Sequence, residues 1–230
     1  ARMKIGRKWL PYGERDRLLS LVDLSFYASK LRYLEAFSLG AAIYLPNRTK
    51  IDLVADAIKG RFSVLYGTVY HMEQILAAIP ACGAPRLASV HAIMVGGSLV
   101  SENLRARIRD RLSHRLYVLY GANECSTSSR TDLSEVFDTP GTVGHPHKGL
   151  ELQIVDASDQ PVPSGQAGFV RLRGETCIDG YLGDATATAR AFRHGWFYPG
   201  DLGRLTKNGQ LIQLGRADDL MIMNGINLYP

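Results

Sequence analysis

Short apolar runs alternate with segments of helical period over the first part of the chain. The runs predict β-strands over residues 21–27, 41–45, 62–66, 91–95 and 116–120. Apolar residues recur at helical spacing between them, which predicts helices over residues 30–39, 49–58, 69–79 and 101–113. Almost continuously apolar strands that alternate with helices are typical of a parallel sheet covered on both faces. The pattern therefore predicts a doubly wound, largely parallel α/β subdomain over residues 21–140.

The pattern changes after about residue 140, where turn residues separate the apolar runs. Strands are predicted over residues 151–155, 168–174, 196–205 and 210–215, and Asn208-Gly209 between the last two is a strong hairpin signal. We expect a small antiparallel, barrel-like β subdomain over residues 141–215. Residues 216–230 are then a hinge and the start of a C-terminal domain, and residues 1–20 form a basic N-terminal segment.

The composition excludes several classes of protein and gives little support to a nucleic-acid partner. Hydrophobic residues make up 46% and charged residues 21%, so collagen-like, low-complexity and wholly disordered chains are excluded. The net charge is +5, but residues 1–17 hold six basic and two acidic residues and so contribute +4 of it. Nucleic-acid readers spread their basic residues over a binding face instead.

The cysteines and the apolar runs indicate in which compartment of the cell the protein is expected. Cys82, Cys125 and Cys177 are an odd number without metal-ligand spacing, which favours a reduced, cytoplasmic location over a disulfide framework or a zinc site. No run approaches the ~18 consecutive apolar residues of a membrane span, and the N-terminus lacks the apolar run of a secretory signal. His145 and His147 form an HxH pair, but the intervening proline and the missing third ligand favour a loop over a metal site.

Glycines follow two predicted strands of the α/β subdomain where each strand ends. Gly96 and Gly97 follow the strand 91–95, and Gly121 follows the strand 116–120. Right-handed crossovers bring the carboxyl ends of parallel strands to one edge, where open α/β sheets bind ligands. We therefore expect a ligand site at this edge.

A more specific signal comes from five short segments taken together. They are MVGGS (94–98), YGANE (120–124), PGTVGHP (140–146), GWFYPGDLG (195–203) and GRADDLMIMNG (215–225). In this order and at these spacings they resemble the adenylate-forming superfamily, which includes acyl- and aryl-CoA synthetases, amino-acid adenylation domains and fatty acyl-AMP ligases. The resemblance covers about residues 20–230. A Rossmann-type oxidoreductase is disfavoured, because no GxGxxG follows a predicted strand.

The resemblance implies an ATP-dependent, AMP-forming acid–thiol ligase. In such enzymes a small-molecule carboxylic acid attacks the α-phosphate of ATP, and the acyl group then passes from the adenylate to CoA or to the phosphopantetheine of an acyl carrier protein. Asn123 and Glu124 become the expected catalytic residues, with Glu124 as a Mg²⁺ ligand. The expected nucleotide contacts are Gly96, Gly97, Ser98, Tyr120, Gly121, Asn123, Asp201 and Arg216.

The residue types suit these implied roles. The Tyr120 ring can stack on adenine, and the two oxygens of Asp201 match a ribose cis-diol. The planar fork of Arg216 can reach ribose and phosphate oxygens. Asn123 stands where the family usually has Thr, and Tyr198-Pro199 replaces a basic residue and Thr. These departures favour the alternative of a non-catalytic module that binds a nucleotide or acyl-adenylate.

The remaining expectations concern the hinge and a basic helix. Asp218 falls at the family's hinge, and the chain is expected to be the latter part of a large domain, truncated there. The family's phosphate loop is then expected upstream and its catalytic Lys downstream, so these residues alone are expected to be inactive. The arginines between Arg105 and Arg115 are either a solvated face or a landing patch for CoA phosphates or an acidic carrier protein.

Overall fold

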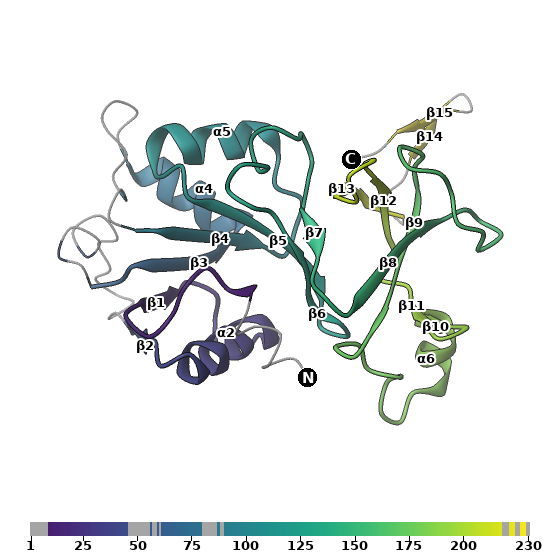
Figure 1. The fold of residues 1–230 in the computed structure, drawn as a ribbon, viewed down its shortest axis with the longest axis horizontal. Helices are drawn as coiled ribbons and strands as arrows, with labels where there is room; N and C mark the ends of the chain where they lie inside the picture. The colour runs from purple at the N-terminus through teal and green to yellow at the C-terminus, as the bar shows by residue number, and fades with distance from the viewer. Residues whose placement is uncertain are drawn as a thin grey trace.

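The structure is a computed structural model that describes residues 9–45, 56, 59, 61–79, 87 and 90–217, with the backbone alone of 221–223 and 226–228. The predicted helix 49–58, apart from Asp56, and the hinge residue Asp218 lie outside the described residues. Figure 1 shows two large sheets, the first formed by strands between residues 17 and 146 and the second by strands between residues 150 and 216.

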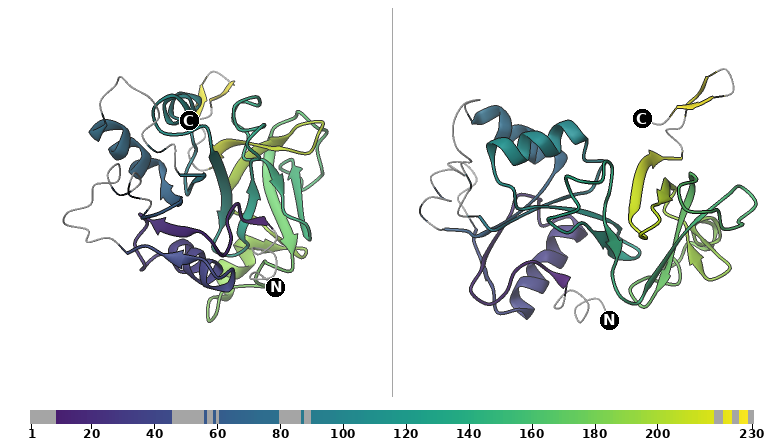
Figure 2. Two further views of the ribbon diagram at one scale, coloured as in Figure 1. Left: turned by 60° about the vertical axis from the view of Figure 1, so that its left-hand side comes forward. Right: turned by 45° about the horizontal axis from the view of Figure 1, so that its top comes forward.

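The first sheet has the order β2-β1-β3-β4-β5-β6-β7 and confirms the predicted doubly wound α/β subdomain. Its parallel strands are β1 (Arg17–Ser20), β2 (Ala42–Ile43), β3 (Val64–Thr68), β4 (Ala92–Gly96) and β5 (Leu116–Ala122). β6 (Ser126–Arg130) and β7 (His145–Pro146) join antiparallel. One face is covered by α2 (Tyr27–Ser38), the other by α4 (Val69–Ala78) and α5 (Glu102–Arg111), as Figures 1 and 2 show.

Alternating side chains of the central strands fill both faces of this sheet. In β3, Leu65 belongs to the apolar core on the side of α4 and α5, whereas Val64 and Tyr66 belong to the core on the side of α2. Successive residues of a strand point to opposite faces, so a strand buried on both faces is apolar throughout. This requirement explains why the sequence shows these strands as continuous apolar runs.

The second sheet is antiparallel, as predicted, with the order β10-β11-β9-β12-β13 and β8 paired to β9. Its strands are β8 (Leu150–Val155), β9 (Gly168–Gly174), β10 (Phe192–Arg193), β11 (Trp196–Phe197), β12 (Asp201–Leu205) and β13 (Leu211–Arg216). α6 (Ala185–Ala191) precedes β10, and β14 (Met221–Met223) pairs with β15 (Ile226–Leu228) in a separate ribbon. The predicted hairpin joins β12 to β13, with Gly209 at φ +81°.

The predicted strand over residues 21–27 is wrong. The strand is β1, which ends at Ser20, and α2 begins at Tyr27. Leu18 and Leu19 of β1 pair with Val64 and Leu65 of β3. The apolar residues that form this strand of the sheet therefore lie before residue 21. The Asp23 carboxylate accepts a hydrogen bond from the Ser25 backbone N–H at 2.8 Å, a local turn that ends the extended chain.

The histidine pair also differs in part from its prediction. His145 lies in β7 rather than in a loop, and its Nε2 is 3.0 Å from a carboxylate oxygen of Glu135. His147 is buried, with Nε2 3.2 Å from the Thr176 hydroxyl and Nδ1 3.0 Å from the Lys148 carbonyl oxygen. Burial lowers the pKa of His147, so this ring favours its neutral form.

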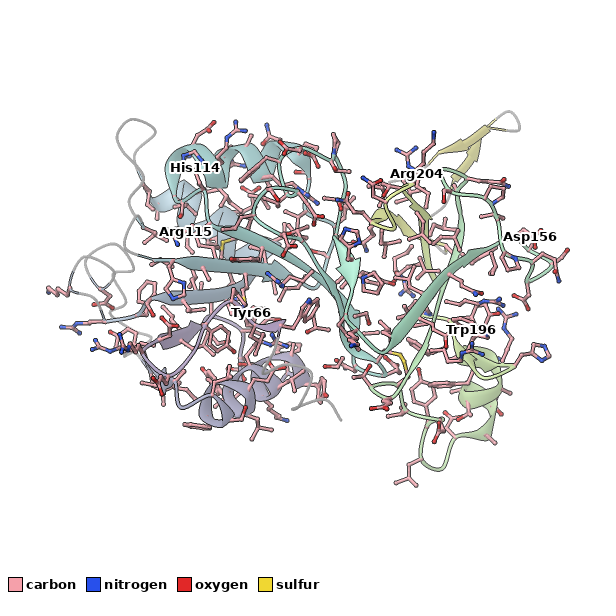
Figure 3. The ribbon with its side chains drawn as sticks, in the orientation of Figure 1. Tyr66, His114, Arg115, Asp156, Trp196 and Arg204 are labelled. Carbon is pink, nitrogen blue, oxygen red and sulfur yellow. A yellow bond between two sulfur atoms is a disulfide. The ribbon has the colours of Figure 1, made fainter. Side chains whose placement is uncertain are left out.

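The basic helix α5 is not a simple solvated face. Arg105 is 1% exposed and donates hydrogen bonds to the carbonyl oxygens of Val100, Val136 and Thr142 at 2.7 to 3.1 Å. Arg111 donates to two carbonyl oxygens at the end of α4. The expectation of a solvated face is therefore wrong for these two arginines. Arg115 is exposed and lies on the part of the first sheet that is distant from the second (Figure 3).

Arg105 should be a major contributor to stability. Arg105→Ala removes three hydrogen bonds from a charged donor and leaves buried carbonyl oxygens without partners, so we expect the free energy of unfolding to fall by at least ~3 kcal/mol. Urea denaturation measures this change. Arg115→Ala is the control and should change the free energy of unfolding by less than ~0.5 kcal/mol. Equal effects of the two substitutions on the free energy of unfolding would contradict a special role of Arg105 in stability.

Candidate active site

A cleft of about 760 Å³ lies between the two sheets, at the carboxyl ends of β4 and β5. Seven of the residues expected to contact nucleotide or metal line it: Gly97, Ser98, Tyr120, Gly121, Glu124, Asp201 and Arg216. The other two, Gly96 and Asn123, line an adjoining cavity. The structure therefore brings residues from both halves of the chain to one place.

Asp201 is the centre of the contacts across this cleft. It is 7% exposed, and one carboxylate oxygen accepts a hydrogen bond from the Tyr120 hydroxyl at 2.7 Å. The other oxygen is 3.4 Å from an Arg216 guanidinium nitrogen, which also donates to the Pro199 carbonyl oxygen at 2.8 Å. Asp201 and Arg216 face each other in the β12–β13 pair, so the sheet register itself places the cation beside the carboxylate.

Two glycines allow the backbone to approach these side chains. Gly121 lies at an irregularity in the β5–β6 pair, where a Cβ would overlap the Ser126 carbonyl oxygen. Gly200 has φ +82°, and a Cβ there would lie 3.0 Å from an Arg216 guanidinium nitrogen. A side chain at Gly121 would force β5 and β6 apart beside Tyr120, whereas one at Gly200 would strain the backbone next to Asp201 and push the Arg216 guanidinium aside.

Glu124 is held by a residue that the sequence analysis did not identify. The Tyr181 hydroxyl donates to a carboxylate oxygen of Glu124 at 2.6 Å. Desolvation and then the carboxylate raise the pKa of Tyr181 to about 12, so the hydroxyl remains a donor at neutral pH. Tyr181 lies between β9 and α6, 57 residues beyond Glu124. No periodicity or spacing in the sequence connects the two residues.

A disulfide joins the same two segments. Cys125, next to Glu124, is bonded to Cys177, and the backbone N–H of Ile178 donates to the Glu124 carbonyl oxygen at 2.9 Å. The expectation of reduced cysteines is therefore wrong for this pair, whereas Cys82 lies outside the described residues. The pairing could not be derived from spacing, because it depends on two loops that meet only in the folded chain.

Two further features are absent from the described part of the chain. It contains no group of three or more His, Cys, Asp or Glu side chains that could hold a metal ion without further ligands. Within the same residues, no helix is long and apolar enough to cross a membrane.

Comparison with known families decides the class of this site. A family model for "AMP-binding enzyme" matches residues 1–182, more than half of the chain. The chain belongs to the AMP-binding enzyme family. This assignment confirms the resemblance to adenylate-forming enzymes.

Individual relatives support the same assignment. The chain is 30% identical over 192 residues to a feruloyl-CoA synthase of Amycolatopsis and 28% identical over 218 residues to the indoleacetate–CoA ligase of Aromatoleum aromaticum. The matches cover 83% and 94% of this chain but only 39% and 42% of those relatives. The fold superposes on ATP-bound MatB from Rhodopseudomonas palustris with a TM-score of 0.86 and 21% identity, over 99% of this chain and 45% of that one. The chain thus spans less than half the length of these proteins.

Tyr120 should make stability sensitive to alkaline pH. Burial, followed by the charge of Asp201, raises the pKa of Tyr120 well above its usual value, and Arg216 opposes this effect. The stabilisation that Tyr120 gives the folded state by keeping its hydroxyl protonated is therefore complete below a pH of about 10, the pKa of a tyrosine in the unfolded chain. This stabilisation is lost as the pH rises toward the higher pKa of Tyr120 in the folded state. We expect the free energy of unfolding to fall above about pH 10 and Tyr120→Phe to reduce that fall. Urea denaturation from about pH 8 to 11 tests this, and an unchanged slope would contradict it.

Proposed function

We propose that this chain forms part of an AMP-forming acid–thiol ligase that activates a carboxylic acid with ATP and transfers the acyl group from the adenylate to a thiol. The main support is the convergence of Tyr120, Glu124, Asp201 and Arg216 on one cleft in a member of the AMP-binding family. These residues come from three separate segments of the chain, 120–124, 195–203 and 215–225, and all four line the same cleft. The proposed location remains the cytoplasm because of the ATP and CoA that such a ligase uses, since the Cys125–Cys177 disulfide removes the support from reduced cysteines.

The nucleotide would lie along this cleft. One oxygen of Asp201 accepts a hydrogen bond from Tyr120, and the other lies beside Arg216. Both oxygens can accept the hydrogen bonds that the two hydroxyls of a ribose cis-diol donate. The ring of Tyr120, at the end of a strand, offers a flat surface for adenine, and Gly97 and Gly121 leave backbone groups accessible beside it. The Asn123 amide and the Arg216 guanidinium are donors suited to phosphate oxygens.

Glu124 is the proposed ligand of Mg²⁺. A single carboxylate fits this ion, because Mg²⁺ in phosphotransfer sites commonly takes one or two carboxylates together with phosphate oxygens and water. Such an ion would neutralise the charge on the phosphates. The hydrogen bond from Tyr181 orients the carboxylate at the rim of the cleft, so Tyr181 is a positioning residue in this proposal.

The acceptor thiol and the domain arrangement are also proposals. The relatives include both CoA ligases and peptide synthetases, so CoA and a carrier-protein phosphopantetheine are both proposed as acceptors. We propose the two predicted subdomains and a hinge at Asp218, with the first subdomain extended beyond 21–140 to include β1 (Arg17–Ser20) and β7 (His145–Pro146) of its sheet. The alternative, a non-catalytic binding module, rests on Asn123 and Tyr198-Pro199. Tyr198 accepts a hydrogen bond from Arg171 at 3.2 Å and lies under the Arg193 guanidinium, so this departure belongs to the packing of the cleft wall.

Asp201 should dominate nucleotide affinity. Hydrogen bonds to a charged group contribute about 1.5–3 kcal/mol each, so Asp201→Ala should weaken AMP binding to the 230-residue chain by ~10²-fold or more. Asp201→Asn keeps the shape and one acceptor and should have an intermediate effect. Calorimetric titration with AMP measures both, with the exposed Asp110→Ala as a control that leaves affinity unchanged. Unchanged affinity in Asp201→Ala would show that the ribose assignment is wrong.

Glu124→Gln should lower turnover more than nucleotide binding, because charge on the phosphates increases as pyrophosphate leaves. The assay is acid-dependent pyrophosphate exchange by a complete ligase that contains this chain, since we expect the 230 residues alone to be inactive. We expect a large fall in kcat that Mn²⁺ partly reverses, and a smaller fall in Tyr181→Phe. An effect limited to the KM for the acid would contradict a role in metal binding. Intact AMP binding without exchange activity in the complete protein would favour the non-catalytic alternative.

A further inference from the structure

The disulfide between Cys125 and Cys177 joins the two sheets directly beside Glu124. Cys125 lies between β5 and β6 of the first sheet, and Cys177 lies just after β9 of the second sheet. Two hydrogen bonds join the same segments: the Ile178 backbone N–H donates to the Glu124 carbonyl oxygen at 2.9 Å, and the Tyr181 hydroxyl donates to a Glu124 carboxylate oxygen at 2.6 Å. The position of Glu124 therefore depends on how these two segments are held together.

The covalent link is the one that fixes the distance between the segments. Cys125 directly follows Glu124, and Cys177 directly precedes Ile178. A disulfide keeps the Cα atoms of its two residues within about 7 Å of each other, whereas hydrogen bonds to exposed segments can be exchanged for hydrogen bonds to water. Ile178 and Asp179 are both exposed. Once the disulfide opens, Glu124 is held only by contacts that water can replace.

The two segments differ in how firmly the rest of the chain holds them. Tyr181 is attached to α6, because its backbone N–H donates to the Thr188 hydroxyl at 2.8 Å. On the other side, Ser126 directly follows Cys125 and has φ +64°, a left-handed conformation that residues other than glycine rarely adopt. Such a conformation persists only where the surrounding structure enforces it. The turn that carries Glu124 is therefore the part that relaxes when the disulfide opens.

The two cysteines also differ in exposure. Cys125 is 0% exposed, whereas Cys177 is only partly buried. Cys177 also lines a cavity of about 360 Å³, together with Thr188 of α6 and Phe197 of β11. Thiol–disulfide exchange depends on access to the sulfur that is attacked. Of the two residues, Cys177 is therefore the one that a reductant reaches first.

Reduction by a dithiol accounts for every atom and electron. One thiolate of the dithiol attacks the sulfur of Cys177, the S–S bond breaks, and its electron pair goes to the sulfur of Cys125, which takes up a proton. The second thiolate of the dithiol then attacks the mixed disulfide, and Cys177 leaves and is protonated. The protein gains two electrons and two protons, and the dithiol becomes a disulfide. Oxidised dithiol reverses the reaction.

We propose that Cys125 and Cys177 are a reversible redox modification site that sets the position of Glu124. With the disulfide formed, Tyr181 holds the Glu124 carboxylate for the proposed Mg²⁺. With both cysteines reduced, the turn relaxes and this hydrogen bond is lost. The inference rests on the proposed function, because an ATP-dependent ligase belongs in the cytoplasm, where thiols are kept reduced and disulfides are usually transient. The alternative is a permanent disulfide that a reductant reaches only in the unfolded chain.

The first test follows the modification in the folded 230-residue chain with Cys82→Ser, which removes the third thiol. The chain is equilibrated with mixtures of reduced and oxidised dithiothreitol without denaturant, and alkylation followed by mass spectrometry counts the free thiols. We expect both thiols to appear and to disappear again while far-ultraviolet circular dichroism stays constant. Hydrogen exchange of the Ile178 amide, measured by NMR, should become at least ~10-fold faster in the reduced chain, because this amide donates to Glu124.

The second test measures acid-dependent pyrophosphate exchange by a complete ligase that contains this chain. Reduction should raise the Mg²⁺ concentration for half-maximal exchange by ~10-fold, the loss expected when a charged ligand loses the hydrogen bond that orients it. Cys177→Ser changes the partly buried cysteine to a residue of similar size and should show the raised Mg²⁺ requirement under oxidising and reducing conditions alike. Cys82→Ser is the matched control and should keep the response to dithiothreitol.

Each outcome decides a separate point. Reduction that requires denaturant, or unchanged exchange of the Ile178 amide in the reduced chain, overturns the inference and leaves the proposed function standing. An active ligase whose Mg²⁺ requirement is the same in both redox states also overturns it. If the complete ligase has no exchange activity in either state, the proposed function fails, and the control of Mg²⁺ binding fails with it.

Discussion

A buried carboxylate at the junction of the two sheets is the constraint on which the site depends. Asp201 is almost excluded from solvent, and a buried charge is costly unless it is paired and hydrogen-bonded. The first sheet supplies the Tyr120 hydroxyl from the end of β5, and the second supplies Arg216 from β13. The requirement to satisfy one side chain therefore ties the two sheets together and shapes the cleft between them.

The same arrangement explains how structural and functional contacts can coincide. The proposed nucleotide contacts use groups that the protein already orients: a carboxylate with two placed oxygens, a tyrosine ring at a strand end, and a guanidinium fixed to the Pro199 carbonyl oxygen. Glu124 is similarly oriented by Tyr181 and lies next to a disulfide between the two loops. Groups that are oriented before binding lose less conformational freedom when a ligand arrives.

The two cavities differ in character although they share a wall. Several charged side chains line the larger one, Glu124, Asp201 and Arg216 among them, whereas Arg32 is the one charged side chain among the described residues that line the smaller one. The shared wall of glycines and Tyr120 is also where the reacting carboxylate would meet the phosphate in the proposed reaction.

Patterns in the sequence were sufficient to predict the α/β class, the antiparallel second sheet, the Asn208-Gly209 hairpin and the family. These features depend on local periodicity, local turn chemistry or short motifs, all of which are visible in a linear chain. The tertiary structure decided the start of β1, the burial of Arg105, the Tyr181–Glu124 hydrogen bond and the Cys125–Cys177 bond. Each depends on contact between segments distant in the chain. Such contacts follow from how whole elements pack, and packing leaves no periodic trace in the order of the residues.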